Sequence, residues 1–338
     1  MNKLKNTKYP PITVLSTVKN IRETVDRWMT SLLSQDYPRE YTLVVIDSNS
    51  TDGTRERLQE YAKKYPSKIR IIEYESTQPQ ALNYAIQNRI VKTELVALID
   101  GDCEAPPTWL RTLVDALMET GSDIVGGPGL TPSGVNFLQK LIGLDLDMRF
   151  LRTKRGFVTR HPNMNMLVKK EVLESVPFDE SLKIGYDADF GHRVTQAGYR
   201  IFFEPKAYVY HYHRSTLRGY IKQQINYARF LVKFYLKSPS AAKGDNINPP
   251  IMLYQPLLFG LSLLFAIAWL ISNNSLFDII SVGLILAVLM LQTIDIVYVI
   301  KVKKTPLALL LYPLYMFRLV LWIIGGILGI LDLITRRR

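Results

Sequence analysis

The sequence predicts an α/β domain with a doubly wound, mostly parallel sheet, followed by helices that enter a membrane. Two observations lead to this fold class. Over the first half of the chain, short runs of strand-forming residues alternate with residues at helical spacing, which is typical of a parallel sheet covered by helices. From Pro249 to Ile334 charged residues become rare and the apolar runs become long. The 338 residues are enough for one soluble domain and one membrane domain.

Four strands and their connecting helices account for the predicted sheet. The strands are expected at 12–17, 41–46, 69–73 and 95–99, with helices at about 20–34, 54–64, 80–90 and 107–118. Parallel strands of this kind end on one edge of the sheet, so Thr17, Asp47 and Asp100 should gather there. Three later elements are expected: a strand and glycine turn at 123–130, an amphipathic helix at 135–151, and a strand at 207–213 that places His211 and His213 on one face.

The most informative stretch is 93–107, where an apolar strand stops at Asp100-Gly101-Asp102. Two carboxylates at positions i and i+2 of an extended chain point the same way. They could hold a hard divalent cation, with water and phosphate oxygens as further ligands. Gly101 would leave room for a diphosphate. The alternative is a capped turn before a helix, where Asp is common.

Charge and cysteine content narrow the setting. The net charge is +12, but its basic residues cluster before the first apolar segment, which favours anionic lipid or phosphate-bearing substrates over nucleic acid. The single Cys103 excludes an intramolecular disulfide and fits a reducing compartment. The N-terminal residues are polar and basic and do not resemble a signal peptide. We therefore expect the first domain on the cytoplasmic side of the cell membrane.

Residues 214–237 form the clearest amphipathic helix in the sequence. At helical spacing one side carries five cations, and the other carries aromatic and aliphatic residues; the cations are Arg218, Lys222, Arg229, Lys233 and Lys237. A basic, aromatic-rich helix next to apolar segments is typical of one that lies in the membrane interface. The alternative is a surface helix packed on the soluble domain.

The C-terminal part, 249–338, is predicted to hold about three membrane helices, at 251–272, 277–300 and 314–334. The basic segment 301–304 would then lie on the cytoplasmic side, as the positive-inside rule expects. Pro313 and Arg318 complicate the last segment, and Arg318 could pair with Asp295. A third span would place Arg336–Arg338 outside, against the charge rule. A re-entrant or in-plane last segment is the alternative.

Several motifs, taken in order, resemble the inverting family 2 glycosyltransferases. They are ITVLSTVKN, VVIDSNSTDGT, QALNYA, LIDGD, GYDADF and QQINY, spread over residues 10–237. The resemblance is strongest to the membrane branch, which is similar to cellulose synthase and to lipid-linked sugar transferases. It implies a GT-A fold, a Rossmann-like doubly wound mixed sheet, as the cytosolic catalytic domain over 1–213, with 214–248 as an interfacial helix and linker.

The resemblance also implies roles for individual residues. Thr17 and Asp47 would line the nucleotide pocket, and Asn83 would lie near the sugar or nucleotide. Asp100 would contact the nucleotide sugar, and Asp102 would bind it through a divalent metal, Mg²⁺ or Mn²⁺.

Asp187 matches the catalytic base. The alternative for Asp187 is a helix cap, with Asp189 paired to Arg193. His211 matches a histidine that helps to coordinate metal or diphosphate, and its alternative is a structural role. Gln223 and Tyr227 occupy the position of the Q-x-x-R-W element of processive polymerases.

The sequence departs from the family pattern at three places. Ser48 replaces the second acid of the usual D-D-G-S motif, so the contact to the base differs. Tyr186 replaces the Glu that usually precedes the catalytic Asp, which affects contacts to the acceptor. Asn226-Tyr227 replaces the R-W pair, which argues against a processive polymerase.

The sequence therefore predicts a membrane-anchored, metal-dependent, inverting glycosyltransferase. Its donor would be a GDP- or UDP-linked hexose, with a lean toward GDP-mannose. Its acceptor would be held at the membrane, as a polyprenyl-linked saccharide or phosphate in N-glycan or cell-surface glycan assembly. One alternative is a processive polysaccharide synthase. Another is an inactive homologue that binds nucleotide sugar or lipid as an assembly partner.

Overall fold

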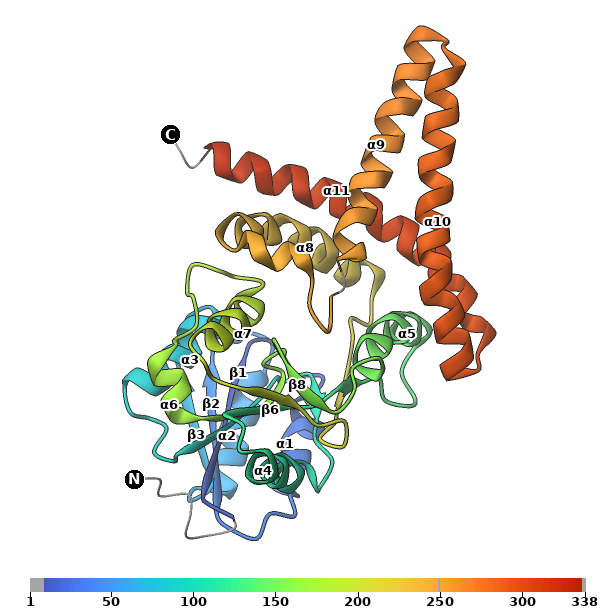
Figure 1. Cartoon of the computed structure of the whole chain (residues 1–338). Coiled ribbons are helices and arrows are strands. Elements are labelled where there is room, and N and C mark those ends of the chain that lie inside the picture. The colour runs from blue at the N-terminus through green and yellow to red at the C-terminus, as the bar shows by residue number, and fades with distance from the viewer. Residues whose placement is uncertain (1–8, 249, 336–338) are drawn as a thin grey trace. The chain divides into compact units, whose positions relative to one another are not determined.

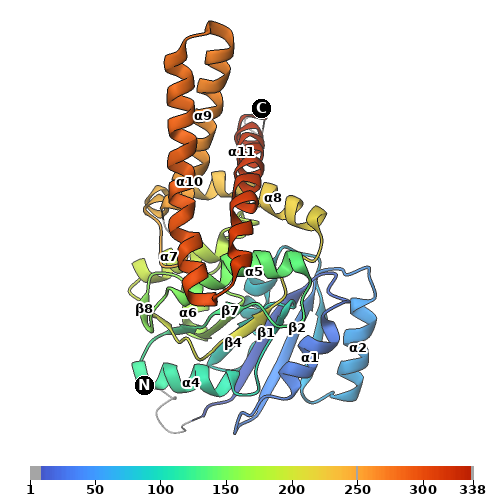
Figure 2. The same cartoon turned by 90° about the vertical axis from the view of Figure 1, so that its right-hand side faces the viewer.

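The structure, a computed structural model, describes residues 9–248 and 250–335, and the chain divides into two compact units. The first unit comprises residues up to 135 together with 150–213. The second comprises 136–149 and the residues from 214 onward. Figure 1 and Figure 2 show the sheet-containing unit and the helical unit from two sides. Each unit is described separately below.

The first unit is built on an eight-stranded mixed sheet with the order β3-β2-β1-β4-β9-β6-β10-β8. The strands are β1 (Ile12–Val18), β2 (Tyr41–Asp47), β3 (Ile69–Glu73), β4 (Leu95–Ile99), β6 (Ile124–Gly126), β8 (Gly156–Val158), β9 (Asn165–Lys169) and β10 (Ile201–Phe203). The first four strands are parallel, whereas β9 runs antiparallel to both β4 and β6. This arrangement confirms the predicted mixed α/β sheet.

The chain order creates a switch point between β1 and β4. After β1 the chain adds β2 and β3 on one side, and it then returns to place β4 on the other side. Ligands of open α/β sheets bind outside the carboxyl ends of the strands at such a point. The central strands are buried along nearly their whole length, which explains why they are continuous apolar runs rather than alternating ones.

Helices cover the sheet at about the predicted positions (Figure 2). They are α1 (Val25–Leu33), α2 (Thr54–Lys64), α3 (Gln78–Gln87), α4 (Trp109–Thr120), α6 (Lys170–Ser175) and α7 (Tyr186–Gln196). The start of α3 shows why its position was predictable: Thr77 and Gln80 form a capping box, and Pro79 lies in the first turn.

A small second sheet joins segments that are far apart in the sequence. It has the order β5-β11-β7, with β5 (Cys103–Glu104), β11 (Val209–His211) and β7 (Gly129–Leu130). β11 is shorter than the predicted strand at 207–213. It runs antiparallel to β5, so that His211 lies opposite Cys103. This pairing brings a histidine next to the acidic turn that follows β4.

The second unit consists of helices. They are α5 (Phe137–Leu151), α8 (Leu217–Lys237), α9 (Ile251–Ser272), α10 (Ser275–Lys303) and α11 (Leu311–Thr335), with short 3₁₀ helices at Pro239–Lys243 and Pro306–Leu310. α9 and α10 form a hairpin through Asn273, which adopts a left-handed conformation, and Asn274, whose side chain caps α10. Figure 1 shows α11 running beside α8 and at a wide angle to this hairpin.

Within the described residues, three helical stretches are long and apolar enough to cross a membrane: Ile251–Ser272, Ser275–Lys303 and Pro306–Thr335. The first matches the predicted span, and the second is longer than predicted at both ends. The third begins before the predicted start at 314. Pro313 lies in the first turn of α11, where its missing N–H is not needed by the helix. Arg336–Arg338 lie outside the described residues.

The second unit is discontinuous in sequence. It contains residues 136–149 as well as the residues from 214 onward. The reason is packing: Leu141, Ile142 and Met148 of α5 share one hydrophobic cluster with Tyr220 of α8 and Leu311 of α11. The apolar face of this helix is thus covered by residues that follow far later in the chain. The division into a catalytic domain, a linker and a transmembrane domain stays a prediction.

Candidate active site

The ends of β1, β2 and β4 carry three of the predicted site residues. Thr17 is paired with Ile46, next to the pair formed by Val18 and Asp47. Asp100 directly follows β4, the neighbour of β1 on its other side. The parallel register of the strands therefore brings Thr17, Asp47 and Asp100 to one edge of the sheet, as predicted from the strand pattern.

Asp102 lies beside His211 because β5 pairs with β11. The distance from Asp102 Oδ1 to His211 Nε2 is 3.5 Å. Ligand atoms of Asp102, Cys103 and His211 all lie within 4.8 Å of one another. The ring of His213 packs edge-on against His211 at 4.7 Å, and its Nε2 lies 2.9 Å from Thr131 Oγ1. The two histidines are therefore adjacent, as the predicted strand required.

Asp100 is the most electrostatically unusual carboxylate of this group. Burial and the negative charge of Asp102 raise its pKa to about 7, and the charge of Asp187 adds to this effect. His211 and the amide of Gln78 act in the opposite direction. Gln78 Nε2 donates a hydrogen bond of 2.8 Å to Asp100 Oδ1. Carboxylates with raised pKa values are frequent where a cation or a proton is to be bound.

Asp187 lies in the first turn of α7, behind Gly185, which has a left-handed φ of 81°. Its negative charge contributes to the raised pKa of Asp100. Its neighbour Asp189 is buried and accepts a 2.7 Å hydrogen bond from Arg193 Nε. The predicted pair of Asp189 and Arg193 is therefore confirmed, and it leaves Asp187 as the partly exposed acid of this turn.

Asn83 holds the loop that leads to Asp187. Its side chain accepts a hydrogen bond from the Phe178 amide and donates to the Phe178 carbonyl, each at 2.9 Å. It also donates to Glu180 Oε1. Because Asn83 is buried and its amide is used in this way, the structure gives it a positioning role for residues 178–180. Its contact with a sugar or nucleotide stays a prediction.

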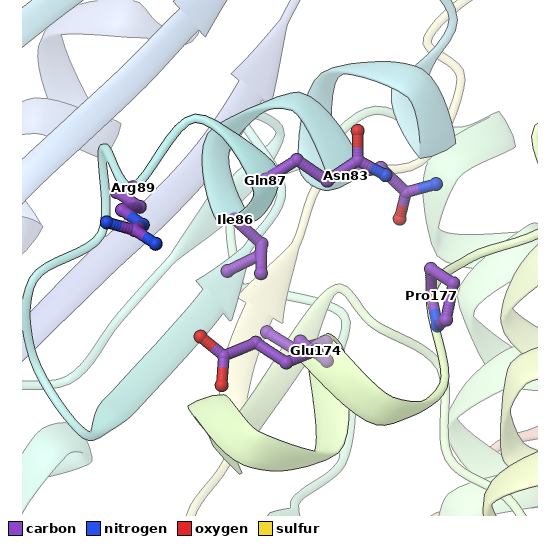
Figure 3. A pocket seen from close by; sticks show the side chains of 7 residues that line it. Asn83, Ile86, Gln87, Arg89, Glu174 and Pro177 are labelled. Carbon is purple, nitrogen blue, oxygen red and sulfur yellow. The ribbon is translucent and has the colours of Figure 1, made fainter.

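A pocket of about 260 Å³ lies between α3 and α6. Figure 3 shows Asn83, Ile86 and Gln87 on the side of α3, with Glu174 and Pro177 across from them. Among the predicted site residues, all of which lie in the described part of the chain, Asn83 alone lines this pocket. The pocket is therefore separate from the residues around Asp102.

Asp47 is completely buried at the end of β2. Its carboxylate accepts hydrogen bonds from Ser50 and, at 3.2 Å, from Arg55 Nε. The backbone N–H of Ser48 binds the Val18 carbonyl at 2.9 Å. The contacts of Asp47 fix the turn after β2, and the hydrogen bond from Ser48 to Val18 joins this turn to the end of β1. A contact between Asp47 and a nucleotide stays a prediction.

Close packing explains the glycine at position 101, and this packing could not be seen from the sequence. A Cβ atom at this position would lie 2.8 Å from Ile21 Cδ1 and 3.0 Å from Val18 Cγ1. The glycine therefore lets the turn between the two acids approach the segment after β1. Room for a diphosphate, the predicted reason for this glycine, is a separate property that stays a prediction.

The three residues predicted for the acceptor or the interface have different surroundings. Tyr186 is buried, packs edge-on against Phe178, and donates a 3.3 Å hydrogen bond to Asn163 Oδ1. Its ring therefore offers little surface to an acceptor. Gln223 and Tyr227 lie one turn apart on α8 in the second unit and are joined by a 3.3 Å hydrogen bond. Their contact with an acceptor stays a prediction.

Sequence reasoning missed two neighbours of the acidic turn. Gln78 is part of a capping sequence, TQPQ, and nothing in its local pattern connects it to Asp100. Cys103 directly follows Asp102, and this position is the signal that could have identified it as a neighbour of the predicted metal ligand. Both contacts depend on the fold, in which α3 and β11 reach the end of β4.

Comparison with known proteins assigns this fold and site to a family. Residues 13–176 match the family described as Glycosyl transferase family 2, and residues 95–330 match Glycosyl transferase family group 2. The second match covers most of the chain, including the α9–α10 hairpin. The chain belongs to the family 2 glycosyltransferases, as its motifs predicted, and its sheet domain has the GT-A fold.

Individual relatives support this assignment. Glycosyltransferase AglE of Haloferax volcanii is 30% identical to this chain over 57% of the chain's length. The match spans 64% of AglE, just under two thirds of that protein. A second relative comes from Methanococcus voltae and is 22% identical over 90% of this chain and 92% of its own length. Its name is dolichyl N-acetyl-α-D-glucosaminyl phosphate 3-β-D-2,3-diacetamido-2,3-dideoxy-β-D-glucuronosyltransferase. The mannosyltransferase PcManGT of Pyrobaculum calidifontis, solved with GDP-Man and Mn²⁺, has a TM-score of 0.57 at 20% identity and covers 96% of this chain and 88% of its own.

The residues around Asp102 fit a divalent cation. A carboxylate and an imidazole converge there beside the Cys103 thiol, and carboxylate and imidazole are both ligands of divalent metal ions in proteins. The nearby carboxylate of Asp100 is repelled by that of Asp102, and a bound cation would relieve this repulsion. Asp102 and His211 are therefore the residues that would hold the metal.

Proposed function

We propose that this chain transfers a hexose, with inversion, from a nucleotide sugar to a polyprenyl-linked acceptor at a membrane surface. The observation that supports the proposal is that Asp102, which closely follows Asp100, and His211 lie close together beside the switch point of the sheet. The negative charge of Asp187 also reaches Asp100, and ligands of α/β sheets bind at this edge.

The acids divide the chemistry between them. A cation at Asp102 and His211 would neutralise the charge that develops on the leaving diphosphate. Asp187 accepts the proton of the attacking acceptor hydroxyl. The acceptor oxygen forms the new bond to the anomeric carbon while the bond from that carbon to the diphosphate oxygen breaks. Because the attack is direct, the anomeric configuration inverts. A phosphate acceptor would need no base.

The donor and acceptor classes rest on the relatives. The structural neighbour was solved with GDP-Man and Mn²⁺, which supports a GDP-linked hexose and a divalent metal. The relative from Methanococcus voltae and a dolichol-phosphate mannosyltransferase of Pyrococcus furiosus are both named for dolichyl-linked substrates. Three apolar helices long enough to cross a membrane fit an acceptor that is held in lipid. The catalytic unit would lie on the cytoplasmic side of the cell membrane.

A panel of donors tests the proposal. The full chain, in membranes of its host, is incubated with labelled GDP- and UDP-hexoses and with Mg²⁺ or Mn²⁺. We expect one labelled lipid product that disappears in Asp102→Ala. A ladder of growing products would replace the proposal with a processive synthase. Donor binding without turnover of any donor would replace it with an inactive assembly partner.

A further inference from the structure

The helix α8 is too highly charged to lie inside a lipid bilayer. Its 21 residues contain five cations and no acid, as the sequence LRGYIKQQINYARFLVKFYLK shows. Each Lys or Arg at the centre of a membrane helix costs about 2.5–3.5 kcal/mol on the insertion scale. At the membrane surface the same cations would contact anionic headgroups, which favours binding.

The helix α11 is in direct backbone contact with α8. A Cβ atom added to Gly325 would overlap the carbonyl oxygen of Ile225, and one added to Gly329 would overlap the carbonyl oxygen of Arg229. The two glycines, four residues apart, lie on one face of α11 and permit this close approach.

Polar contacts on both sides of the glycines fix the same arrangement. Trp322 Nε1 donates a 2.9 Å hydrogen bond to Gln224 Oε1. Asp332 binds Arg229 through two hydrogen bonds of 2.6 and 2.7 Å. The contacts follow one another in the same order along both helices, so α8 and α11 run parallel. Any depth that α11 takes in a membrane is therefore shared by α8.

This shared depth decides between the two arrangements that the sequence left open for the last segment. If α11 crossed the bilayer, it would take Lys222, Arg229 and Lys233 of α8 into the hydrocarbon. We infer that α11 lies in the plane of the membrane surface beside α8. Of the described helices, only α9 and α10 then cross the membrane, and the end of α11 lies on the same side of the membrane as α8.

The outer face of α11 fits an apolar lipid boundary. Six of its seven exposed large apolar residues recur every three or four positions and lie away from the glycines, and the seventh, Ile330, precedes one of them; the six are Phe317, Val320, Ile324, Ile327, Leu331 and Ile334. A helix with one such face can lie with that face in the acyl boundary of a lipid surface. The partner of this face is therefore the bilayer itself, next to the cations of α8.

Labelling of single cysteines from one side of the membrane tests the topology. The chain has only Cys103, which is buried, so the unmodified protein is the background control. Asn274→Cys, Ser238→Cys and Thr335→Cys are treated with a membrane-impermeant maleimide in sealed vesicles of known orientation. We expect Thr335→Cys to label from the same side as Ser238→Cys, and Asn274→Cys from the other. Labelling of Thr335→Cys with Asn274→Cys, or from neither side, would overturn the inference.

A depth measurement gives independent evidence and leaves the contact with α8 unchanged. Nitroxide labels are placed at Phe317→Cys and Leu331→Cys on the outer face of α11, and their depths are compared by collision with oxygen and with a water-soluble relaxer. An in-plane helix places both labels at similar depth. A spanning helix would separate them by roughly 21 Å, from 1.5 Å of rise per residue, and that result would refute the in-plane arrangement.

Discussion

Asp187 and Asp189 show how two acids in the same helical turn acquire different properties. The side chain of Asp189 is buried and bound to Arg193, so it stabilises the helix. The side chain of Asp187 is partly exposed, and its charge contributes to the raised pKa of Asp100. The sequence shows both as members of one motif, and only the structure distinguishes the exposed acid from the internal one.

Asp187→Asn should abolish turnover while donor binding is retained. The amide is close in size to the carboxylate but cannot accept the acceptor's proton, so kcat should fall by roughly 10²–10⁴-fold. The Kd of the nucleotide sugar, measured by calorimetry, should stay within about twofold of the original value because the metal and diphosphate contacts remain.

Asp189→Asn is the matched control for this prediction. Weakening its buried bond to Arg193 should lower the free energy of unfolding by about 1–3 kcal/mol. The folded fraction should keep its turnover. Full activity of Asp187→Asn would remove this residue as the base.

The raised pKa of Asp100 predicts a pH-dependent stability. An aspartate in an unfolded chain has a pKa of about 3.9. In the folded chain the pKa of Asp100 is about 7, so between these two values the folded state holds the additional proton. Stability of the metal-depleted protein should therefore fall as pH rises through this range. Asp100→Asn removes this contribution, and its Asn oxygen can still accept the bond from Gln78.

Thermal unfolding with a chelator measures this effect. The Tm of Asp100→Asn should exceed that of the original protein by an amount that grows from about pH 5 to about pH 7 and then levels off. A difference that is constant across this range would contradict the pKa assigned to Asp100. The variant should at the same time bind donor more weakly.

The residue scale also shows what local patterns can and cannot reveal. Asp100, Asp102 and Asp187 stand in recognisable motifs, so the sequence identified them before their positions were known. The roles of Asn83 and Gln78 depend on what lies across from them in space. Asn83 binds Phe178, which is 95 positions away, and no local pattern contains that information.

Among the elements, α5 is the one whose surroundings the sequence could not predict. The strands and most helices were predictable because apolar spacing and caps are local signals. The amphipathic pattern of α5 was also visible, but the surface that it covers was not. That surface is formed by α8, α10 and α11, which follow far later in the chain. Arg318 was likewise recognised as unusual, whereas its described partner, Asp145, was not.

Among the charged residues of α5, Asp145 should be the one whose replacement lowers stability most. Its carboxylate accepts hydrogen bonds from Arg149 at 2.7 Å, Arg318 at 2.6 Å and Tyr315 at 2.9 Å. Burial alone would raise its pKa, but the two guanidinium groups hold that pKa well below its usual range. Asp145→Ala leaves Arg318 buried without this partner, so the second unit should lose roughly 3–5 kcal/mol of stability.

The double variant Asp145→Leu with Arg318→Met distinguishes a lost charge pair from a lost shape. Replacing both partners of a buried pair by apolar residues is often close to neutral. Thermal unfolding in detergent should therefore show a large loss for Asp145→Ala and a substantial recovery in the double variant. Equal losses in both would mean that the shape of this contact matters more than its charge.

For the molecule as a whole, the contrast between the two units is electrostatic. The first unit gathers acids around its site, whereas the second carries the cations of α8 next to long apolar helices. The sequence predicted this division from composition alone, because charge and hydropathy change sharply along the chain. It could not decide how the last apolar helix is oriented, since composition is the same for a spanning and an in-plane segment.

Turnover should depend on anionic lipid through α8. Arg218 and Lys222 are exposed, and each cation near an anionic surface contributes about 1 kcal/mol. In nanodiscs of increasing anionic lipid content, the full chain should become more active. Arg218→Gln with Lys222→Gln should respond less, since two headgroup contacts are lost.

Lys63→Gln with Lys64→Gln is the control for this prediction, because it removes two exposed cations from the end of α2 in the first unit. It should keep the lipid response of the original chain. An unchanged response in the α8 variant would show that these two cations do not contact anionic lipid.

The membership of α5 in the second unit limits how this protein can be dissected. A fragment that ends at His213 would retain α5 but lack every helix that covers Leu141, Ile142 and Met148. Such a fragment should aggregate, because an apolar face that is buried in the whole chain becomes exposed. A soluble catalytic fragment would need a short linker from Val135 to Phe150 in place of α5. The first unit is thus interrupted in the sequence, and a single truncation of the chain cannot release it intact.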